Sequence, residues 1–352
     1  MPLLARMLLS PLFIDVRAGA VSGLGELLAD RRISAEGHVA VAVGPGQGER
    51  VVEAIRPSLG NADVFTVRGG SIDAAGELQA QLRSSHYDAV VGIGGGRTLD
   101  VAKYAATRLA LPMVAVATNL AHDGIASPVS SLLHEGGKGS FGVSMPIAVV
   151  VDLDYVRASP QRMVSSGIGD IVSDLTAIED WRLAHDVRGE PMDGLAVTLA
   201  RTAAQAVLHR PDGIDSDGFL TVLAEALVMS GMAMAAAGSS RPASGADHEI
   251  MHAVDTLFPG TANHGELAGV GALFSAYLRE DQQLMSELDA CLRRHDLPRS
   301  PADLGLTEEQ FARAVVYAPQ TRPDRYTILE HLDLDETAVK ARVAGFVEAV
   351  GG

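Results

Sequence analysis

The sequence predicts two domains, an α/β domain built on a parallel sheet over residues 1–155 and an all-helical domain over residues 156–352. Short apolar runs alternate with segments of helical periodicity in the first part, which is typical of a parallel sheet covered by helices on both faces. After about Tyr155 these runs vanish, and long patterns rich in Ala, Leu and Met follow. A chain of 352 residues is also longer than one small core normally holds together.

The elements follow from the periodicity of the apolar residues. Apolar runs predict strands at 12–16, 38–43, 63–67, 89–93, 113–117 and 146–151. Helical spacing between them predicts helices at 21–30, 47–58, 71–84 and 99–109. In the second part, helical patterns cover 162–187, 191–209, 217–237, 244–256, 264–279 and 282–295, with shorter ones to the end. We find no internal repeat and no low-complexity tract.

Composition and charge exclude several classes of partner. The formal net charge of −16 argues against nucleic acid or an anionic membrane as the main partner. Cys291 is the one cysteine, so no intrachain disulfide can form and a reducing, cytoplasmic location is expected. Asp15 and Arg17 follow the short apolar N-terminal run, which we interpret as a strand or loop and not a signal peptide. We expect no membrane span.

Three consecutive glycines, Gly94, Gly95 and Gly96, lie between a predicted strand and a predicted helix. The string does not match the dinucleotide fingerprint, which needs glycine at Arg97, and it lacks the spacing of a P-loop. Such glycines still allow a phosphate to approach backbone N–H groups at the positive end of the helix. A tight turn is the alternative, but one glycine usually suffices for that. We therefore expect this loop to bind an anion.

A second loop runs from Thr118 to Pro128 and contains Asn119, Asp123 and Ser127. It follows the next strand, and open α/β sheets bind ligands at the carboxyl ends of neighbouring strands. Its polar side chains are candidates for contact with a cofactor or a hydroxylated substrate. A capped, solvated loop is the alternative.

Three histidines, His248, His252 and His264, occur within residues 241–269. His248 and His252 are four positions apart, so on a helix they share one face with Cβ atoms roughly 5–6 Å apart. Asn263 is a predicted N-cap, which puts His264 in the first turn of the next helix. Two imidazoles could converge from successive helices to hold a metal. Ordinary surface or helix-pair histidines are the alternative.

Asp170 follows Gly167 and Gly169, and we expect it to open a long helix after this glycine break. An acidic residue in a first turn stabilises the helix dipole, which explains most such aspartates without any catalytic role. By itself this segment does not predict a site.

Five segments together carry a family resemblance: GGGRTLDVAK (94–103), TNLAHDGIASP (118–128), GIGDIVSDLTAIEDWRLA (167–184), SGADHEIMH (244–252) and HGE (264–266). In this order they resemble the sn-glycerol-1-phosphate dehydrogenases, a branch of the metal-dependent polyol dehydrogenases related to glycerol dehydrogenase and dehydroquinate synthase. The resemblance covers about residues 10–280, and HDGIASP is among its most specific parts. It implies a dehydroquinate synthase-like fold with a Rossmann-like N-terminal domain and a helical, metal-binding C-terminal domain.

The resemblance also implies a role for each matching residue. Asp170, His248 and His264 would bind one divalent metal, zinc in the first place, with nickel or iron as alternatives. His252 and Asp123 would be the catalytic residues and, with Asp170, would contact the substrate. NAD or NADP would lie along Gly94, Gly95, Gly96, Arg97, Thr98, Asp100, Thr118, Asn119, Ala121 and Ser127.

The implied reaction interconverts dihydroxyacetone phosphate and sn-glycerol 1-phosphate by hydride transfer with NAD(P), a step of phospholipid metabolism. Two imidazoles and one carboxylate leave coordination positions open, so the metal can act as a Lewis acid on the substrate oxygen. His252 or a bound water would supply the proton. The resemblance implies a homo-oligomer, and we expect the reaction in a cleft between the two domains.

The sequence departs from the family pattern at four positions. Arg97 stands where lysine is frequent, and Ala121 replaces a serine that would hydrogen-bond the cofactor. Asp174 replaces an asparagine, and Asp247 a glutamate. In addition, Gly44 and Pro45 end the second strand, without the acidic residue that would disfavour NADP.

Three other interpretations remain open from the sequence. The chain could be a relative of the same fold that acts on another polyol, sugar phosphate or cyclitol. It could be a non-haem iron oxygenase, because two histidines and a carboxylate also suit iron, or a non-catalytic nucleotide-binding protein. Phosphate recognition would separate the first of these, but beyond candidates such as Lys138 the sequence shows no basic cluster for it.

Overall fold

The computed structural model describes residues 9–30, 32–34, 37–60, 62–135 and 137–351. The chain divides into two compact units. Unit 1 comprises Met1–Asn119, Gly124–Ser159 and Gly231–Ser239, and unit 2 comprises Leu120–Asp123, Pro160–Ser230 and Ser240–Gly352. Most of the N-terminal apolar run, which we interpret as a strand or loop, lies outside the described residues.

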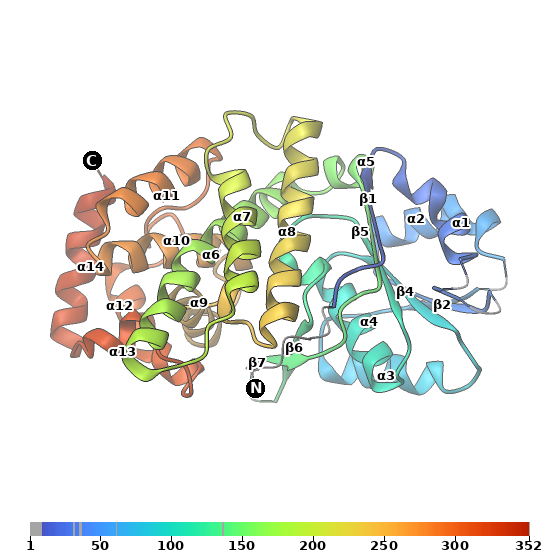
Figure 1. Cartoon of the computed structure of the whole chain (residues 1–352), viewed down its shortest axis with the longest axis horizontal. Helices are drawn as coiled ribbons and strands as arrows, with labels where there is room; N and C mark the ends of the chain where they lie inside the picture. Colours follow the sequence, from blue (N-terminus) through green and yellow to red (C-terminus); the bar gives the residue numbers. More distant parts are fainter. Residues whose placement is uncertain (1–8, 31, 35–36, 61, 136, 352) are drawn as a thin grey trace, which may run out of the picture. The chain divides into compact units, whose positions relative to one another are not determined.

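Unit 1 is built on a six-stranded sheet in which every neighbouring pair of strands is parallel, so the prediction of a parallel sheet is confirmed. The strands are β1 (Phe13–Arg17), β2 (Val39–Val43), β3 (Asp63–Thr66), β4 (Ala89–Gly94), β5 (Met113–Ala117) and β8 (Ala148–Asp152), in the spatial order β1-β8-β5-β4-β2-β3. The helices of this part are η1 (Ala20–Gly23), α1 (Leu24–Leu28), α2 (Gln47–Ile55), η2 (Arg56–Ser58), α3 (Ile72–Leu82), α4 (Gly96–Arg108) and α5 (Leu153–Arg157). Figure 1 shows α1 and α2 on one side of the sheet and α3 and α4 on the other.

The core of unit 1 consists of the central strands β2, β4, β5 and β8, whose residues are all buried. Their Val, Ala and Ile side chains are covered on both faces, which is why these strands appear as continuous apolar runs. The register pairs Gly94 at the end of β4 with Ala117 at the end of β5. The N–H of Thr118 donates to the carbonyl of Gly94 at 3.0 Å. The glycine loop and the loop that begins at Thr118 therefore leave the sheet side by side.

An antiparallel hairpin of β6 (Val129–His134) and β7 (Gly137–Gly142) follows the second loop, and the sequence did not predict it. Its glycines and serines hide the strand pattern. The hairpin is tied to α4, because the buried Nζ of Lys103 donates to the carbonyls of Ser127 at 3.2 Å and Val129 at 2.5 Å. The hydroxyl of Ser130 donates to the carbonyl of Asp100 at 2.9 Å.

Unit 2 is helical, and each long helix predicted in the second part of the chain is confirmed. Beyond β8 the helices are α6 (Gln161–Arg188), α7 (Gly194–Leu208), α8 (Asp217–Ala237), η4 (Arg241–Ala243), α9 (Ala246–Leu257), α10 (His264–Leu278), α11 (Gln282–Arg294), α12 (Glu308–Tyr317), η5 (Ala318–Thr321), α13 (Ile328–Leu332) and α14 (Glu336–Gly351). The short helix η3 (Asp123–Ile125) lies in the loop after β5.

Helix α8 is long and apolar enough to cross a membrane by length and composition, although we expected no such segment. However, 61 % of its most apolar window is buried inside the structure. A helix that is hydrophobic on all sides and buried is typical of the core of a large globular protein.

The helices α6 and α10 contact each other backbone to backbone. A Cβ added to Gly169 would overlap the carbonyl oxygen of Gly265, and a Cβ added to Gly265 would overlap the carbonyl oxygen of Ser166. The N–H of Gly265 donates to the hydroxyl of Ser166 at 3.0 Å. Here the expectation that Asp170 opens a helix is wrong, because α6 begins at Gln161 and runs through Gly167 and Gly169 without a break. These glycines allow close packing and do not end the helix.

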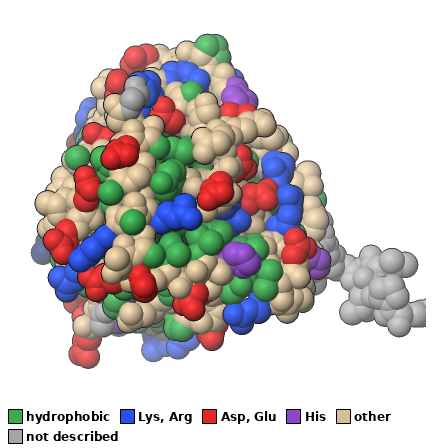
Figure 2. All heavy atoms as spheres, turned by 90° about the vertical axis from the view of Figure 1, so that its left-hand side faces the viewer, with side chains coloured by type: hydrophobic (Ala, Val, Ile, Leu, Met, Phe, Trp, Pro, Cys, Tyr) green, Lys and Arg blue, Asp and Glu red, His purple; other side chains and the backbone are tan. Residues whose placement is uncertain are grey.

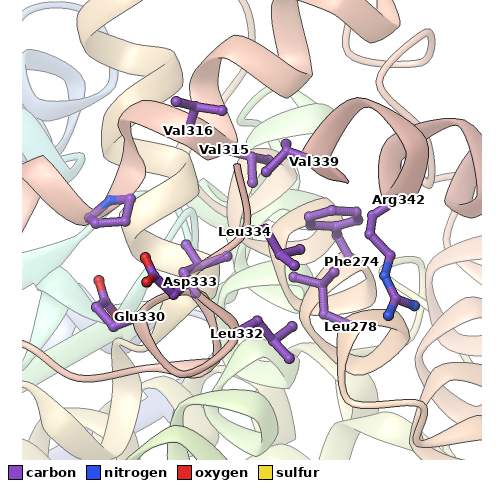
Figure 3. A pocket seen from close by; sticks show the side chains of 12 residues that line it. Phe274, Leu278, Val315, Val316, Glu330, Leu332, Asp333, Leu334, Val339 and Arg342 are labelled. Atoms are coloured by element: carbon purple, nitrogen blue, oxygen red, sulfur yellow. The ribbon is translucent and has the colours of Figure 1, made fainter. Parts of the chain in front are cut away.

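Unit 2 also contains an apolar cavity of about 250 Å³ beside α12, α13 and α14. Figure 3 shows Phe274, Leu278 and Leu334 close together, with the charged end of Arg342 directed away from them. None of the predicted site residues lines this cavity, so it is not part of the predicted site. On the face of unit 2 seen in Figure 2, acidic and basic side chains are interspersed, whereas a nucleic-acid surface gathers basic ones.

The replacement of Gly169 by alanine should destabilise unit 2. The added Cβ has no space against Gly265, and overpacking of this kind costs typically about 1–3 kcal/mol of unfolding free energy. The matched control is Gly76→Ala on the exposed side of α3, where an added Cβ meets nothing within 4 Å. That change should be neutral or stabilise by about 0.5–1 kcal/mol. Urea denaturation of both variants measures the difference, and equal midpoints would contradict the packing argument.

Candidate active site

Three side chains converge in unit 2, namely Asp170 from α6, His248 from α9 and His264 from the first turn of α10. Nε2 of His264 lies 3.2 Å from Oδ1 of Asp170. Nε2 of His248 lies 3.3 Å from Nε2 of His264 and 3.7 Å from the same carboxylate oxygen. A cation about 2.0–2.1 Å from each of three tetrahedrally arranged ligands would hold those atoms about 3.3 Å apart. The spacing of the three ligand atoms therefore fits a divalent metal.

The ligand atoms are aimed by hydrogen bonds on their outer sides. Nδ1 of His248 donates to Oδ1 of Asp247 at 2.5 Å, which leaves the lone pair of Nε2 directed at the other two ligands. Oδ2 of Asp170 accepts the backbone N–H of Asp123 at 2.9 Å, which leaves Oδ1 for a cation. Asp247 is itself held, because the hydroxyl of Thr176 donates to its Oδ2 at 2.9 Å.

Helix α6 also fixes the start of α9. Oδ2 of Asp180 accepts the backbone N–H of Ala246, the first residue of α9, at 2.7 Å. Gly245, the N-cap, has no side chain that could do this. The position of His248 along its helix therefore depends on two contacts with α6, through Asp180 and through Thr176.

The pKa values of Asp170 and His248 indicate that the ligand group attracts positive charge. Burial would raise the pKa of Asp170, but hydrogen bonds from His248 and His264 outweigh burial and hold this pKa well below its usual range. Burial disfavours charge on His248, but its hydrogen bonds to Asp170 and Asp247 outweigh this and raise its pKa to about 10. A bound cation would replace the proton that these carboxylates attract.

A further carboxyl group, Asp174, lies one turn along α6 from Asp170. Burial raises the pKa of Asp174 well above its ordinary value, and the charges of Asp123 and Asp170 raise it further. Ser230 lies nearby, and its hydroxyl donates to Oδ2 of Asp123 at 3.3 Å.

His252 lies on the same face of α9 as His248, with ring centroids 6.5 Å apart. Nη2 of Arg322 lies 2.9 Å from Nε2 of His252. A guanidinium only donates, so Nε2 of His252 is an acceptor in this contact. The sequence analysis missed Arg322, which comes from the chain after η5, far from any motif.

His122 was also missed as an individual candidate. Its ring centroid lies 5.3 Å from that of His264, so a third imidazole stands beside the ligand group. Its position next to Asp123 in the second loop could have identified His122 as a candidate. Ser230, in the apolar helix α8, offered no comparable signal.

The glycine loop in unit 1 has the form expected of an anion site. Gly95 is the N-cap of α4 and has no side chain, so no capping side chain accepts the first-turn N–H groups, although the N–H of Thr98 donates to the carbonyl of Gly95 at 3.0 Å. A Cβ on Gly95 would overlap the amide of Asn119, which covers the loop. Arg97 packs along Gly70, and Thr98 is buried against Gly94.

The remaining residues expected along the cofactor differ in their exposure. Thr118 and Ser127 are buried, and Ala121 is half-buried. Asp100, also expected along the cofactor, is buried. Its buried carboxylate lies 3.1 Å from Nζ of Lys103, which in turn holds the β6–β7 hairpin. This pairing gives Asp100 a structural role beneath the loop.

The predicted residues divide between the two units. The glycine loop, Arg97, Thr98, Asp100, Thr118, Asn119 and Ser127 belong to unit 1. Ala121, Asp123, Asp170, His248, His252 and His264 belong to unit 2, where the structure brings the three metal-ligand candidates together.

Sequence comparisons find relatives over almost the whole chain. A family model described as iron-containing alcohol dehydrogenase matches residues 15–160. The glycerol-1-phosphate dehydrogenase (NAD(P)+) of Hyperthermus butylicus is 37 % identical over 345 residues, which cover 96 % of this chain and 98 % of that protein. The enzyme of the same name from Methanosarcina mazei is 33 % identical, and the match covers 92 % of each chain.

Solved structures show the same fold. A probable glycerol dehydrogenase from Sinorhizobium meliloti superposes with a TM-score of 0.80 at 21 % identity, over 98 % of this chain and 99 % of that one. An iron-containing alcohol dehydrogenase gives a TM-score of 0.70 at 16 % identity, over 99 % of both chains. The predicted fold class is thereby confirmed. Because the sequence identity to the Hyperthermus and Methanosarcina enzymes extends over more than nine tenths of the chain, the chain belongs to the glycerol-1-phosphate dehydrogenase family.

Proposed function

We propose that this protein is an NAD(P)- and metal-dependent dehydrogenase that interconverts dihydroxyacetone phosphate and sn-glycerol 1-phosphate. Relatives over nearly the whole chain are named for glycerol 1-phosphate and NAD(P). The observation that carries the proposal is the group formed by Asp170, His248 and His264, whose ligand atoms all lie within 4.8 Å of one another.

These three residues would hold one divalent cation through a carboxylate oxygen and two imidazole nitrogens. The donor set suits zinc, and nickel and iron are the alternatives. When bound, the cation supplies a Lewis acid for the substrate oxygen, and NAD(P) supplies or accepts the hydride. Asp247 and the backbone N–H of Asp123 keep the ligand atoms in place, so the site is formed before the substrate arrives.

In unit 1, Gly94, Gly95 and Gly96 would receive the pyrophosphate of the cofactor at the N-terminus of α4. The other contacts would come from Arg97, Thr98, Thr118, Asn119, Ala121 and Ser127, with Asp100 supporting the loop from beneath. The structure ends β2 at Val43, followed by Gly44 and Pro45, with no carboxylate there to repel a 2′-phosphate. We therefore propose that both NAD and NADP are accepted.

His252 and Asp123 would contact the substrate and are the proposed catalytic residues. Since Nε2 of His252 accepts from Arg322, a proton delivered by this ring would come from Nδ1 while that contact lasts. A bound water is the alternative source. The second candidate function is a dehydrogenase of the same fold acting on another polyol, sugar phosphate or cyclitol.

We further propose a cytoplasmic homo-oligomer. Cys291 is buried and unpaired, which suits a reducing compartment. β1 is an edge strand of the sheet, and Leu12, Phe13 and Ile14 beside and within it are exposed. An exposed apolar edge strand is a template for pairing with a second chain.

Purified protein supplied with zinc should consume NADH or NADPH when dihydroxyacetone phosphate is added. Loss of absorbance of the reduced nicotinamide measures the rate, and a chelator should abolish it because the ligand group requires its cation. Readdition of metal should restore the rate. Turnover that survives complete removal of metal, or inertness toward every ketone phosphate, would overturn the proposal.

Asp247→Asn should weaken metal binding about 10- to 100-fold, because loss of the hydrogen-bond partner of a metal-ligating histidine typically lowers metal affinity by this factor. Competition against a chromophoric chelator measures the affinity. Glu287→Gln, a change of a half-buried acid on α11 outside the ligand group, is the control and should leave the affinity unchanged. Wild-type affinity in Asp247→Asn would show that His248 does not need this partner.

Ile14→Lys should dissociate the oligomer, because a charge on an edge strand prevents pairing. Val64→Lys, at an exposed position of β3 on the opposite edge of the sheet, is the matched control and should leave the mass unchanged. Light scattering after gel filtration gives the mass of each. A monomeric wild type, or dissociation by the Val64 change alone, contradicts the assignment of β1.

A further inference from the structure

A cluster of arginines lies beside His252 in unit 2 and takes no part in the metal-ligand group. Arg322 contacts His252, with Nη2 2.9 Å from the ring Nε2. Arg325 follows three positions later and donates to the carbonyl of Ser244 and, at 2.9 Å, to the hydroxyl of Ser240. Both side chains are half-buried, so their charges are partly desolvated while a ligand from solution can still reach them.

The cluster concentrates positive charge. Arg325 is held by neutral acceptors, a carbonyl and a hydroxyl. Burial and the neighbouring charges of Arg241 and Arg322 lower the pKa of Arg325 to about 10, against the opposing charges of Glu249 and Asp247. Burial also lowers the pKa of Arg322. Arg241 is paired with Glu190, so the half-buried guanidinium groups of Arg322 and Arg325 are the ones that can attract an anion.

The position of the cluster suggests which anion. Arg322 contacts the ring of His252, and that ring lies next to His248, one of the three candidate ligands. In a ketone such as dihydroxyacetone phosphate, one methylene and one ester oxygen separate the carbonyl carbon from phosphorus. A substrate whose carbonyl oxygen lies at the metal ligands would therefore place its phosphate near His252. The guanidinium of Arg322, which contacts the ring of His252, could then bind that phosphate.

We propose that Arg322 binds the phosphate group of the substrate, with Arg325 adding to the local positive potential. This inference rests on the proposed function and names the group that selects a phosphorylated ketone. A guanidinium suits the task because its planar fork can bind two phosphate oxygens at once. Lys138, the basic candidate visible in the sequence, lies on β7 in unit 1, whereas Arg322 lies in the unit that holds the ligand group.

The test compares phosphorylated and unphosphorylated substrate in Arg322→Ala and Arg322→Lys. With dihydroxyacetone phosphate, Arg322→Ala should raise KM on the order of 10- to 100-fold, the value of a hydrogen bond between charged groups. With dihydroxyacetone, which has no phosphate, the same variant should lose much less, and whatever it loses there measures the effect of Arg322 on His252. Arg322→Lys should fall between, because it keeps the charge and loses the fork. Arg182→Ala, which removes an exposed arginine of α6, is the control and should behave as wild type.

A second measurement does not need catalysis. Inorganic phosphate should raise the melting temperature of the metal-loaded wild type and of Arg182→Ala, and should raise that of Arg322→Ala clearly less, because in this variant only the glycine loop is left to bind it. If Arg322→Ala fails to fold, Arg322→Lys and Arg322→Gln are measured in the same way.

Wild-type KM and wild-type phosphate protection in Arg322→Ala would overturn the inference. Equal losses with both ketones would also overturn it, because they would show that Arg322 acts only by positioning His252. If the wild type reduces neither ketone, the proposed function fails, and the phosphate-protection measurement alone then decides whether Arg322 binds phosphate.

Discussion

The direct backbone contact between α6 and α10 is the constraint on which the ligand group of unit 2 depends. Gly169 and Gly265 leave no room for a Cβ, and Gly265 donates its N–H to Ser166, 99 positions away in the chain. With any larger residue at the crossing, the two helices would have to separate. Asp170 and the first turn of α10 would separate with them, and the 3.2 Å approach of His264 to the carboxylate would be lost.

Helix α6 acts as the reference frame for all three candidate ligands. It supplies Asp170 itself, it holds Asp247 behind His248 through Thr176, and it receives the first N–H of α9 on Asp180. The carboxylate of Asp170 is buried in a place that would normally disfavour charge, and the hydrogen bonds from His248 and His264 outweigh that cost. A divalent cation is the natural complement of this arrangement, because it neutralises the carboxylate and uses both nitrogen lone pairs.

The sequence predicted the architecture well where one physical signal dominated. Buried parallel strands such as β4 appear as unbroken apolar runs, and helices such as α10 have clear caps. The prediction was wrong where tertiary packing overrides local preference, since Gly167 and Gly169 resemble a helix break and are in fact contact points. The metal ligands were assigned through family resemblance, because the histidines alone left the alternatives open. The arginine cluster was not predicted because Arg322 and Arg325 meet His252, Ser240 and Ser244 only in three dimensions.

The candidate ligands come from three helices, so no short stretch of the unfolded chain can reproduce the group formed by Asp170, His248 and His264. A cation with this binding site therefore binds the folded state almost exclusively, and it adds about 4 kcal/mol of stability when its free concentration is a thousand times the Kd. With such a cation, metal supply would set how long the helical unit resists unfolding and proteolysis, in addition to whether it can turn over substrate. When metal is limiting, the amount of this protein in the cell would fall first.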